Sequence, residues 1–162
     1  MRSGATARKP RDVGFGYVAS STTIGEGDWI FEAGATNLGC PQGWKPSPES
    51  ERARALRKGK PQDDTFVLQH TGRYPPGAAA DYLDEIRSRV AACRPRPGTS
   101  VRIAAQGFAG QQSLLVVFDY GEGSVSKHIF VREGDVLTEI FAKPARSDQA
   151  SRQLGRRAAA RF

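Results

Sequence analysis

The chain has 162 residues, 38% of them hydrophobic, and carries a net charge of +7 from 24 Lys and Arg against 17 Asp and Glu. This length fits one domain that buries its own core, which excludes a small scaffold held together by metals or many disulfides. The longest apolar run, Leu114 to Phe118, is far too short to span a bilayer, and Met1 to Arg11 lacks the apolar stretch of a signal peptide.

The N-terminal segment differs in composition from the rest of the chain. Residues 1–12 are polar, basic and without hydrophobic periodicity, so we expect a disordered basic tail or linker there and a single domain over residues 13–162. A tail of this kind is typical of a segment that follows a membrane anchor. If residue 1 is not the true start, the domain is expected outside the cytoplasm, attached to the membrane only through that missing anchor.

The next segments give weaker patterns. Val13 to Ser20 and Asp28 to Ala33 are predicted strands, with Gly25-Glu26-Gly27 as the turn between them. From Gly34 to Pro48 the density of Gly, Pro and Asn predicts an irregular loop that contains Cys40.

A short helix is predicted after this loop. It runs from Glu49 to Lys58, with Ser47 or Ser50 as its N-cap, and Gly59 and Pro61 end it.

The second half of the chain is clearer. Thr65 to Tyr74 is a predicted strand, and the segment from Ala78 to Cys93 is a predicted helix. Its apolar side chains recur at intervals of three and four residues, which places them on one helix face: Ala79, Leu83, Ile86, Val90 and Cys93.

Four β-rich runs follow, separated by glycine-containing turns that suit consecutive antiparallel hairpins. They are Thr99 to Phe108, Ser113 to Tyr120, Ser124 to Arg132 and Asp135 to Lys143. A last helix is predicted over Ser147 to Phe162, with a basic face. These elements predict an α+β fold, an antiparallel sheet of about five to seven strands with two main helices packed on one face.

The two cysteines allow two readings. A bond between Cys40 and Cys93 would close a long loop, and the chain-entropy model gives such a bond roughly 4 kcal/mol, which favours an oxidising compartment. The alternative is two reduced thiols in a cytoplasmic protein. No Cys-x-x-Cys motif activates either thiol, so a redox enzyme is not expected.

The two histidines, His70 and His128, lie in separate predicted strands. Structural zinc sites use paired ligands a few residues apart, and here His70, His128, Cys40 and Cys93 are all widely spaced. We therefore expect no metal and no cofactor. Each histidine is expected at the edge of the sheet or on its outer face.

A serine hydrolase would need a nucleophile, a base and an acid in contact. The residue types are present as Ser113, Ser124 or Ser126 with His128 and Asp119, but no Gly-x-Ser-x-Gly elbow accompanies them. The adjacent Asp63 and Asp64 would point to opposite sides of a strand, which does not suit paired acid and base catalysis. The sequence predicts no enzyme.

Nucleic-acid binding is not expected either. The basic residues lie in the segment from Arg52 to Lys60 and on the last helix, and neither group alternates with aromatic side chains or matches a docking motif.

Several segments together resemble the extracellular PknH-like sensor domain of actinobacteria and its secreted and lipid-anchored (lipoprotein) relatives. The similar segments are Arg73 to Gly77, Ala78 to Ala80, Ile86-Arg87, Val90 to Cys93, Phe130 to Leu137 and Leu154 to Phe162. The resemblance implies an α+β domain with disulfides outside the membrane and a cleft for a ligand, and it does not imply catalysis.

The function expected from these observations is a non-catalytic extracytoplasmic sensor or ligand-binding domain, whose partner is an unknown small molecule or cell-envelope component. The candidate ligand-binding residues each interrupt an apolar or alternating strand: Gln69, Arg102, His128 and Arg132. The alternative is a cytoplasmic α+β interaction module with reduced cysteines.

Overall fold

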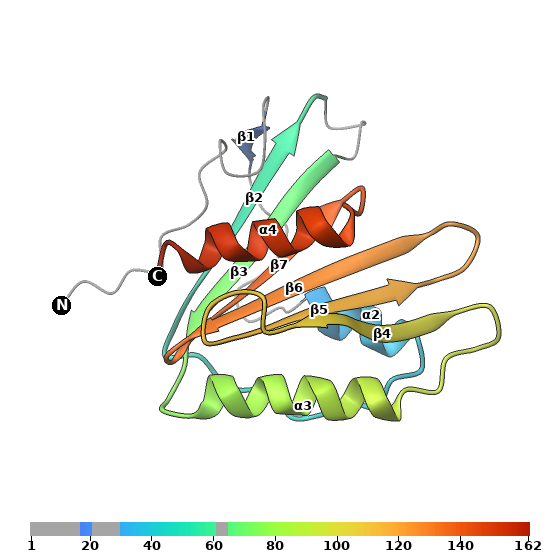
Figure 1. Ribbon diagram of the computed structural model, residues 1–162, viewed down its shortest axis with the longest axis horizontal. Coiled ribbons are helices and arrows are strands. Elements are labelled where there is room, and N and C mark those ends of the chain that lie inside the picture. Colours follow the sequence, from blue (N-terminus) through green and yellow to red (C-terminus); the bar gives the residue numbers. More distant parts are fainter. Residues whose placement is uncertain (1–16, 21–29, 61–64) are drawn as a thin grey trace.

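The computed structural model describes residues 17–20, 30–60 and 65–162, and within them all strands belong to one antiparallel sheet (Figure 1). The sheet has seven strands in the order β1-β2-β3-β7-β6-β5-β4. The strands are β1 (Tyr17–Ser20), β2 (Ser50–Lys58), β3 (Thr65–Arg73), β4 (Ser100–Gln106), β5 (Gln112–Asp119), β6 (Val125–Glu133) and β7 (Val136–Lys143). The helices are α2 (Ile30–Asn37), α3 (Ala78–Ala92) and α4 (Asp148–Ala159). The predicted α+β fold and antiparallel sheet are confirmed.

Strands β4 to β7 form the meander that the sequence predicts, each paired with the next. The β6–β7 hairpin is tight: Glu133 pairs with Val136, and Gly134 in the turn has a φ of 57°. Glycine adopts this left-handed conformation without the strain that a Cβ would add. Strand β7 then pairs with β3, so the meander joins the earlier part of the chain at the middle of the sheet.

The two long helices lie on opposite faces of the sheet, which corrects the prediction that both pack on one face (Figure 1). Leu114 and Phe118 of β5 belong to the cluster that contains α3, whereas Leu115 and Val117 belong to the cluster that contains Leu154 of α4. Side chains alternate between the faces of a strand. Because β5 is apolar on both faces, each face needs its own cover.

The segment from Ser50 to Lys58 is strand β2, so the predicted helix there is wrong. All nine of its residues pair with β3. Its composition favours a helix by only tenths of a kcal/mol per residue, which the hydrogen bonds offered by β3 outweigh. The alternation of Arg52 and Arg54 with Ala53 and Ala55 has the period of a strand.

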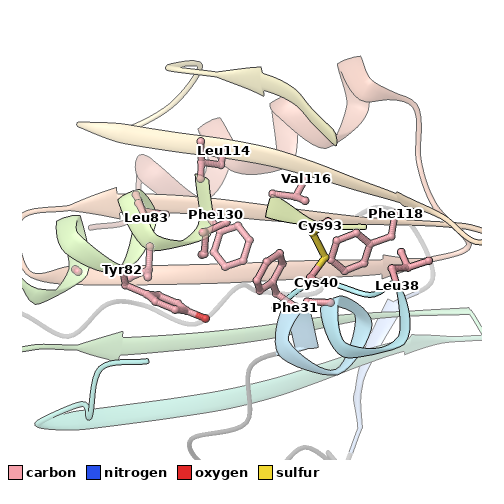
Figure 2. Packing of buried hydrophobic residues seen from close by; sticks show 14 of the residues in the cluster. Phe31, Leu38, Cys40, Tyr82, Leu83, Cys93, Leu114, Val116, Phe118 and Phe130 are labelled. Atoms are coloured by element: carbon pink, nitrogen blue, oxygen red, sulfur yellow. A yellow bond between two sulfur atoms is a disulfide. The ribbon is translucent and has the colours of Figure 1, made fainter. Parts of the chain in front are cut away.

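The segment from Ile30 to Asn37 is helix α2, which corrects both the strand predicted over Asp28 to Ala33 and the start of the predicted loop. Phe31 and Ala35 of this helix are fully buried in the cluster shown in Figure 2, against β5, β6 and α3. A short apolar run does not distinguish a buried strand from a buried helix. The contacts of Phe31 decide between the two.

The two long helices follow the sequence predictions closely. Helix α3 ends at Ala92 with Cys93 as its C-cap, and the predicted stripe is buried, including Leu83 and Ile86, except for Val90, which is partly buried. Helix α4 starts at Asp148, where the Ser147 side chain accepts a hydrogen bond from the Ala150 N–H.

Some predictions fall outside the described residues: the tail over residues 1–12, the start of the first strand, the turn over residues 25–27, and Asp63 with Asp64. Among the helices that the structure describes, none is long and apolar enough to span a membrane.

Candidate functional site: a pocket beside helix α2 and its Ser-His-Glu floor

A pocket of about 930 Å³ lies beside α2, against the ends of β6 and β7. The N-terminal end of β6 and its turn, the C-terminal end of β7 and one side of α2 form its walls. The described lining residues are Ile30, Ala33, Gly34, Asn37, Thr65, Tyr120, Gly123, Ser124, Val125, Ser126, Lys127, His128, Phe141, Ala142, Lys143, Pro144 and Ala145. This set is largely apolar, carries two lysines and contains no carboxylate.

Helix α2 is held in place from its C-terminal side by a disulfide. Cys40, three residues beyond the end of α2, is bonded to Cys93 at the C-terminus of α3, and both are buried in the core (Figure 2). Of the two readings of the cysteines, the structure has the bonded one. This bond ties α2 to the core cluster on the face of the sheet that α3 covers.

A charged cluster holds the first turn of α2. The Glu32 carboxylate accepts a hydrogen bond of 2.6 Å from the Tyr82 hydroxyl and one of 2.7 Å from Nη1 of Arg89. The Arg89 Nε donates to the Pro41 carbonyl at 3.0 Å, so one guanidinium binds both ends of the α2 segment. Only arginine offers two donors in a rigid fork of this kind.

The cluster changes the titration of both partners of Glu32. Burial opposes the charge of Arg89, but its hydrogen bond to Glu32 and the charge of that carboxylate outweigh burial and raise the Arg89 pKa. Burial, and then the charge of Glu32, raise the pKa of Tyr82 well above its ordinary value. At neutral pH Arg89 is therefore charged and Tyr82 is a neutral hydrogen-bond donor.

The sheet approaches α2 closely at Gly34. A Cβ at this position would overlap the Phe118 ring and lie 2.9 Å from the Tyr120 hydroxyl. The absence of a side chain lets the helix lie directly against Phe118 of β5 and against Tyr120, which follows β5 and lines the pocket.

The floor of the pocket holds a serine in contact with a histidine. The Ser126 Oγ lies 3.2 Å from Nε2 of His128, two residues further along the same face of β6. The same Oγ lies 3.4 Å from the hydroxyl of Tyr120. Ser126 is 8% exposed and His128 1% exposed, and both line the pocket.

The second nitrogen of His128 faces a carboxylate. Nδ1 lies 3.3 Å from Oε1 of Glu139, which comes from the adjacent strand β7 and is fully buried. The same Oε1 accepts a hydrogen bond of 2.8 Å from the Phe31 N–H in the first turn of α2. Backbone N–H groups there have no partner within the helix, and the helix dipole favours a negative charge. The N-terminus of α2 therefore stabilises the Glu139 carboxylate.

Aromatic rings fix the orientation of His128. The imidazole centroid lies 4.8 Å from that of Phe118, 5.3 Å from that of Phe141 and 6.2 Å from that of Phe31. The ring is thus packed on several sides, with Nε2 directed to Ser126 and Nδ1 to Glu139. The prediction that His128 lies at a sheet edge or on its outer face is wrong, because β6 is an interior strand covered on this face by α2.

His70 is also fully buried, which corrects the same prediction for that residue. It lies on β3 opposite Glu139 of β7, and its Nε2 lies 2.7 Å from the Glu51 carboxylate of β2. A second histidine and carboxylate pair therefore lies on the same face of the sheet. His70 does not line the pocket.

The four predicted ligand-binding residues are not brought together. His128 and Arg132 lie on the α3 face of β6, whereas Gln69 and Arg102 lie on the α4 face, Arg102 exposed on the edge strand β4. Arg132 contacts Gln112 and the β6–β7 turn, and Gln69 donates to Thr71. Among the four, only His128 lines the pocket.

Of the serines and the acid named as possible partners of His128, Ser126 is the one that makes a hydrogen bond with it among the described residues. Ser113 accepts from the N–H groups of Phe108 and Ala109, and Asp119 accepts from that of Gly121. The acid beside His128 is Glu139, which the sequence analysis missed. Folding the predicted hairpin about Gly134 would have found it, because that register places Glu139 opposite Phe130, diagonally next to His128.

Within residues 17–20, 30–60 and 65–162, no group of three or more His, Cys, Asp or Glu side chains is placed to hold a metal ion. Comparison with known proteins gives no match: no family model, no curated protein and no solved structure matches this chain. The resemblance to actinobacterial sensor domains therefore stays a prediction.

Proposed function

We propose that the chain is an extracytoplasmic ligand-binding domain of the sensor type, and that its ligand occupies the pocket beside α2. The observation that carries the proposal is the pocket itself: about 930 Å³, beside a helix anchored on both sides. Volumes of this size are typical of small-molecule sites.

The lining indicates the chemistry of the ligand. Ile30, Ala33, Phe141 and Pro144 offer an apolar wall, and the hydroxyls of Ser126 and Tyr120 offer hydrogen bonds at one end. The described lining residues contain no carboxylate, and one of the two lysines, Lys127, is paired with Asp148 at 2.7 Å, so the pocket suits a neutral molecule with an apolar part better than a cation.

The disulfide supports an oxidising location. Disulfides persist outside the cytoplasm and are rare within it. The Cys40–Cys93 bond also bears on ligand binding, because it fixes one end of the helix that forms the pocket wall.

A matched pair of variants tests the pocket. Ala33 is exposed and lines the pocket, whereas Thr36 is exposed on the same helix and is not among its lining residues. A panel of cell-wall fragments, lipids and small metabolites is screened by thermal shift. Ala33→Trp is expected to abolish the shift given by any hit, and Thr36→Trp to retain it. A hit that both variants bind equally, or a panel without hits, counts against the proposal.

The location has its own test. Cells producing the chain are treated with a thiol-alkylating reagent before lysis, and the intact mass is measured with and without reduction. We expect alkylation of Cys40 and Cys93 only after reduction. Two thiols alkylated without reduction contradict an oxidising compartment and favour the cytoplasmic interaction module.

A further inference from the structure

We propose that Ser126, His128 and Glu139 form an acyl-transfer site, so that the pocket takes a short-chain ester or thioester and its acyl group is transferred to Ser126. The inference rests on the proposed function, because it assumes that the pocket is a ligand site. It goes beyond the expectation of a non-catalytic domain, which was drawn from residue types without their contacts.

The two nitrogens of His128 contact the atoms that a serine nucleophile and its acid would supply. A serine nucleophile needs a base at Nε2 and an acid that holds the proton on Nδ1, and these are the two contacts His128 makes, at 3.2 Å and 3.3 Å. Such contacts are often somewhat long before a ligand is bound. The constellation is defined by this geometry and these roles, and it occurs on unrelated folds.

His128 and Glu139 are each oriented by their surroundings. Phe118 and Phe141 pack on the His128 ring, and the Phe31 N–H holds Oε1 of Glu139. Glu139 is not among the described residues that line the pocket and contacts His128 at Nδ1, so it acts through His128 as a positioning residue. Preorganisation of this kind distinguishes a reactive serine from an ordinary surface hydroxyl.

The pocket gives a ligand access to Ser126. Ser126 and His128 are almost completely buried yet both line the pocket, so the serine is reached only through it. The Tyr120 hydroxyl lies 3.4 Å from the Ser126 Oγ and also lines the pocket.

The reaction balances with water as the only co-reactant. The Ser126 Oγ forms a bond to the acyl carbon while its proton passes to Nε2 of His128, and the tetrahedral adduct expels the alcohol or thiol, which takes that proton. The carbon–oxygen or carbon–sulfur bond of the substrate breaks in this step. Water, deprotonated by His128, then attacks the acyl-serine, releases the carboxylic acid and returns the proton to Oγ.

The apolar wall suits a short acyl chain. Phe141, Ala142 and Pro144 line the side formed by β7 and the segment after it, next to the serine on β6. The absence of carboxylates among the described lining residues means that the released acid is not repelled there.

The test uses the full chain with its disulfide intact, an alkyl fluorophosphonate as covalent probe and p-nitrophenyl butyrate as substrate. We expect a single phosphonyl adduct by intact mass, mapped to Ser126, as Oγ displaces fluoride. Ser126→Ala abolishes this adduct, and Ser88→Ala, at an exposed serine of α3, does not.

His128→Gln slows hydrolysis of p-nitrophenyl butyrate about 10²–10⁴-fold. Glu139→Gln lowers kcat with KM unchanged, which a purely structural role would not produce.

Butyrate binding separates this inference from the proposed function. It is measured from the changes in the amide chemical shifts of α2 and β6. Butyrate binding without any adduct or hydrolysis overturns the acyl-transfer site and leaves the ligand pocket standing. Labelling or hydrolysis that persists in folded Ser126→Ala also overturns it. Absence of both binding and reaction overturns the acyl-transfer site, whereas the thermal-shift panel with Ala33→Trp decides the ligand pocket. Circular dichroism of each variant establishes that it is folded.

Discussion

The Phe31 N–H donates a hydrogen bond of 2.8 Å to Oε1 of Glu139, joining the first turn of α2 to strand β7 across 108 residues of sequence. This contact places a buried carboxylate at the N-terminus of the helix that forms the pocket wall. It also fixes the carboxylate beside His128. The position of α2 and the orientation of the histidine therefore depend on the same glutamate.

Replacing Glu139 is expected to loosen α2. Glu139→Leu leaves the buried Phe31 N–H without its acceptor, which costs about 1–3 kcal/mol of unfolding free energy. Glu139→Gln keeps an acceptor oxygen and is expected to cost about 1 kcal/mol. Urea denaturation measures both, and hydrogen exchange of the α2 amides shows where the loss occurs. Glu49→Gln, at an exposed glutamate, is the control. Equal stability of the Leu and Gln variants would contradict the prediction.

Removing the disulfide is expected to destabilise the whole domain. Cys40 and Cys93 are separated by 53 residues, and the chain-entropy model assigns a bond of this loop length about 4 kcal/mol. The Cys40→Ser and Cys93→Ser double variant is compared with the parent by urea denaturation, with and without reductant. Reductant should lower the stability of the parent and leave the variant unchanged. A loss below about 1 kcal/mol is the opposing outcome.

Substituting Gly34 tests the contact between α2 and the sheet. In an unpacked helix, Gly→Ala gains about 1 kcal/mol. Here the added methyl group overlaps the Phe118 ring, so Gly34→Ala is expected to lose about 1–3 kcal/mol instead. Thr36→Ala on the exposed side of α2 changes helix propensity and removes an exposed hydrogen bond to the Glu32 carbonyl without touching the sheet, and it serves as the control. A stabilised Gly34→Ala variant would show that α2 is not packed as described.

Alkaline unfolding should report two buried tyrosines. Burial, and then the charges of nearby carboxylates, raise the pKa of Tyr74 and of Tyr82 above the ordinary 10.0. Above about pH 10 the unfolded chain releases these protons and the folded chain retains them. Stability is therefore complete below the unfolded pKa and falls as the pH rises through and beyond it.

Tyrosinate absorbance and circular dichroism measure this as a function of pH. The contribution of Tyr74 and Tyr82 is isolated by difference from the Tyr74→Phe, Tyr82→Phe double variant. Ionisation of Tyr74 and Tyr82 should appear together with unfolding. The double variant should lose stability less steeply as the pH rises. Ionisation of both tyrosines in a chain that is still folded is the contrary result.

The sequence by itself determined the elements whose pattern is local. The apolar stripe of α3, the Ser147 cap of α4 and the glycine turns of the meander are set by residues close together in the chain. The run from Leu114 to Phe118 likewise indicated a strand buried on both faces, because it has no polar side to expose.

The tertiary structure alone decided what depends on distant partners. It made Ser50–Lys58 a strand, because β3 offers a hydrogen-bond ladder that outweighs weak helix propensity, and it made Ile30–Asn37 a helix, because Phe31 packs in the core. It also decided the Ser126, His128 and Glu139 contacts. Residue types specify chemistry only when strand register and helix packing bring their atoms within hydrogen-bond distance, and here a hairpin and the anchored α2 do so.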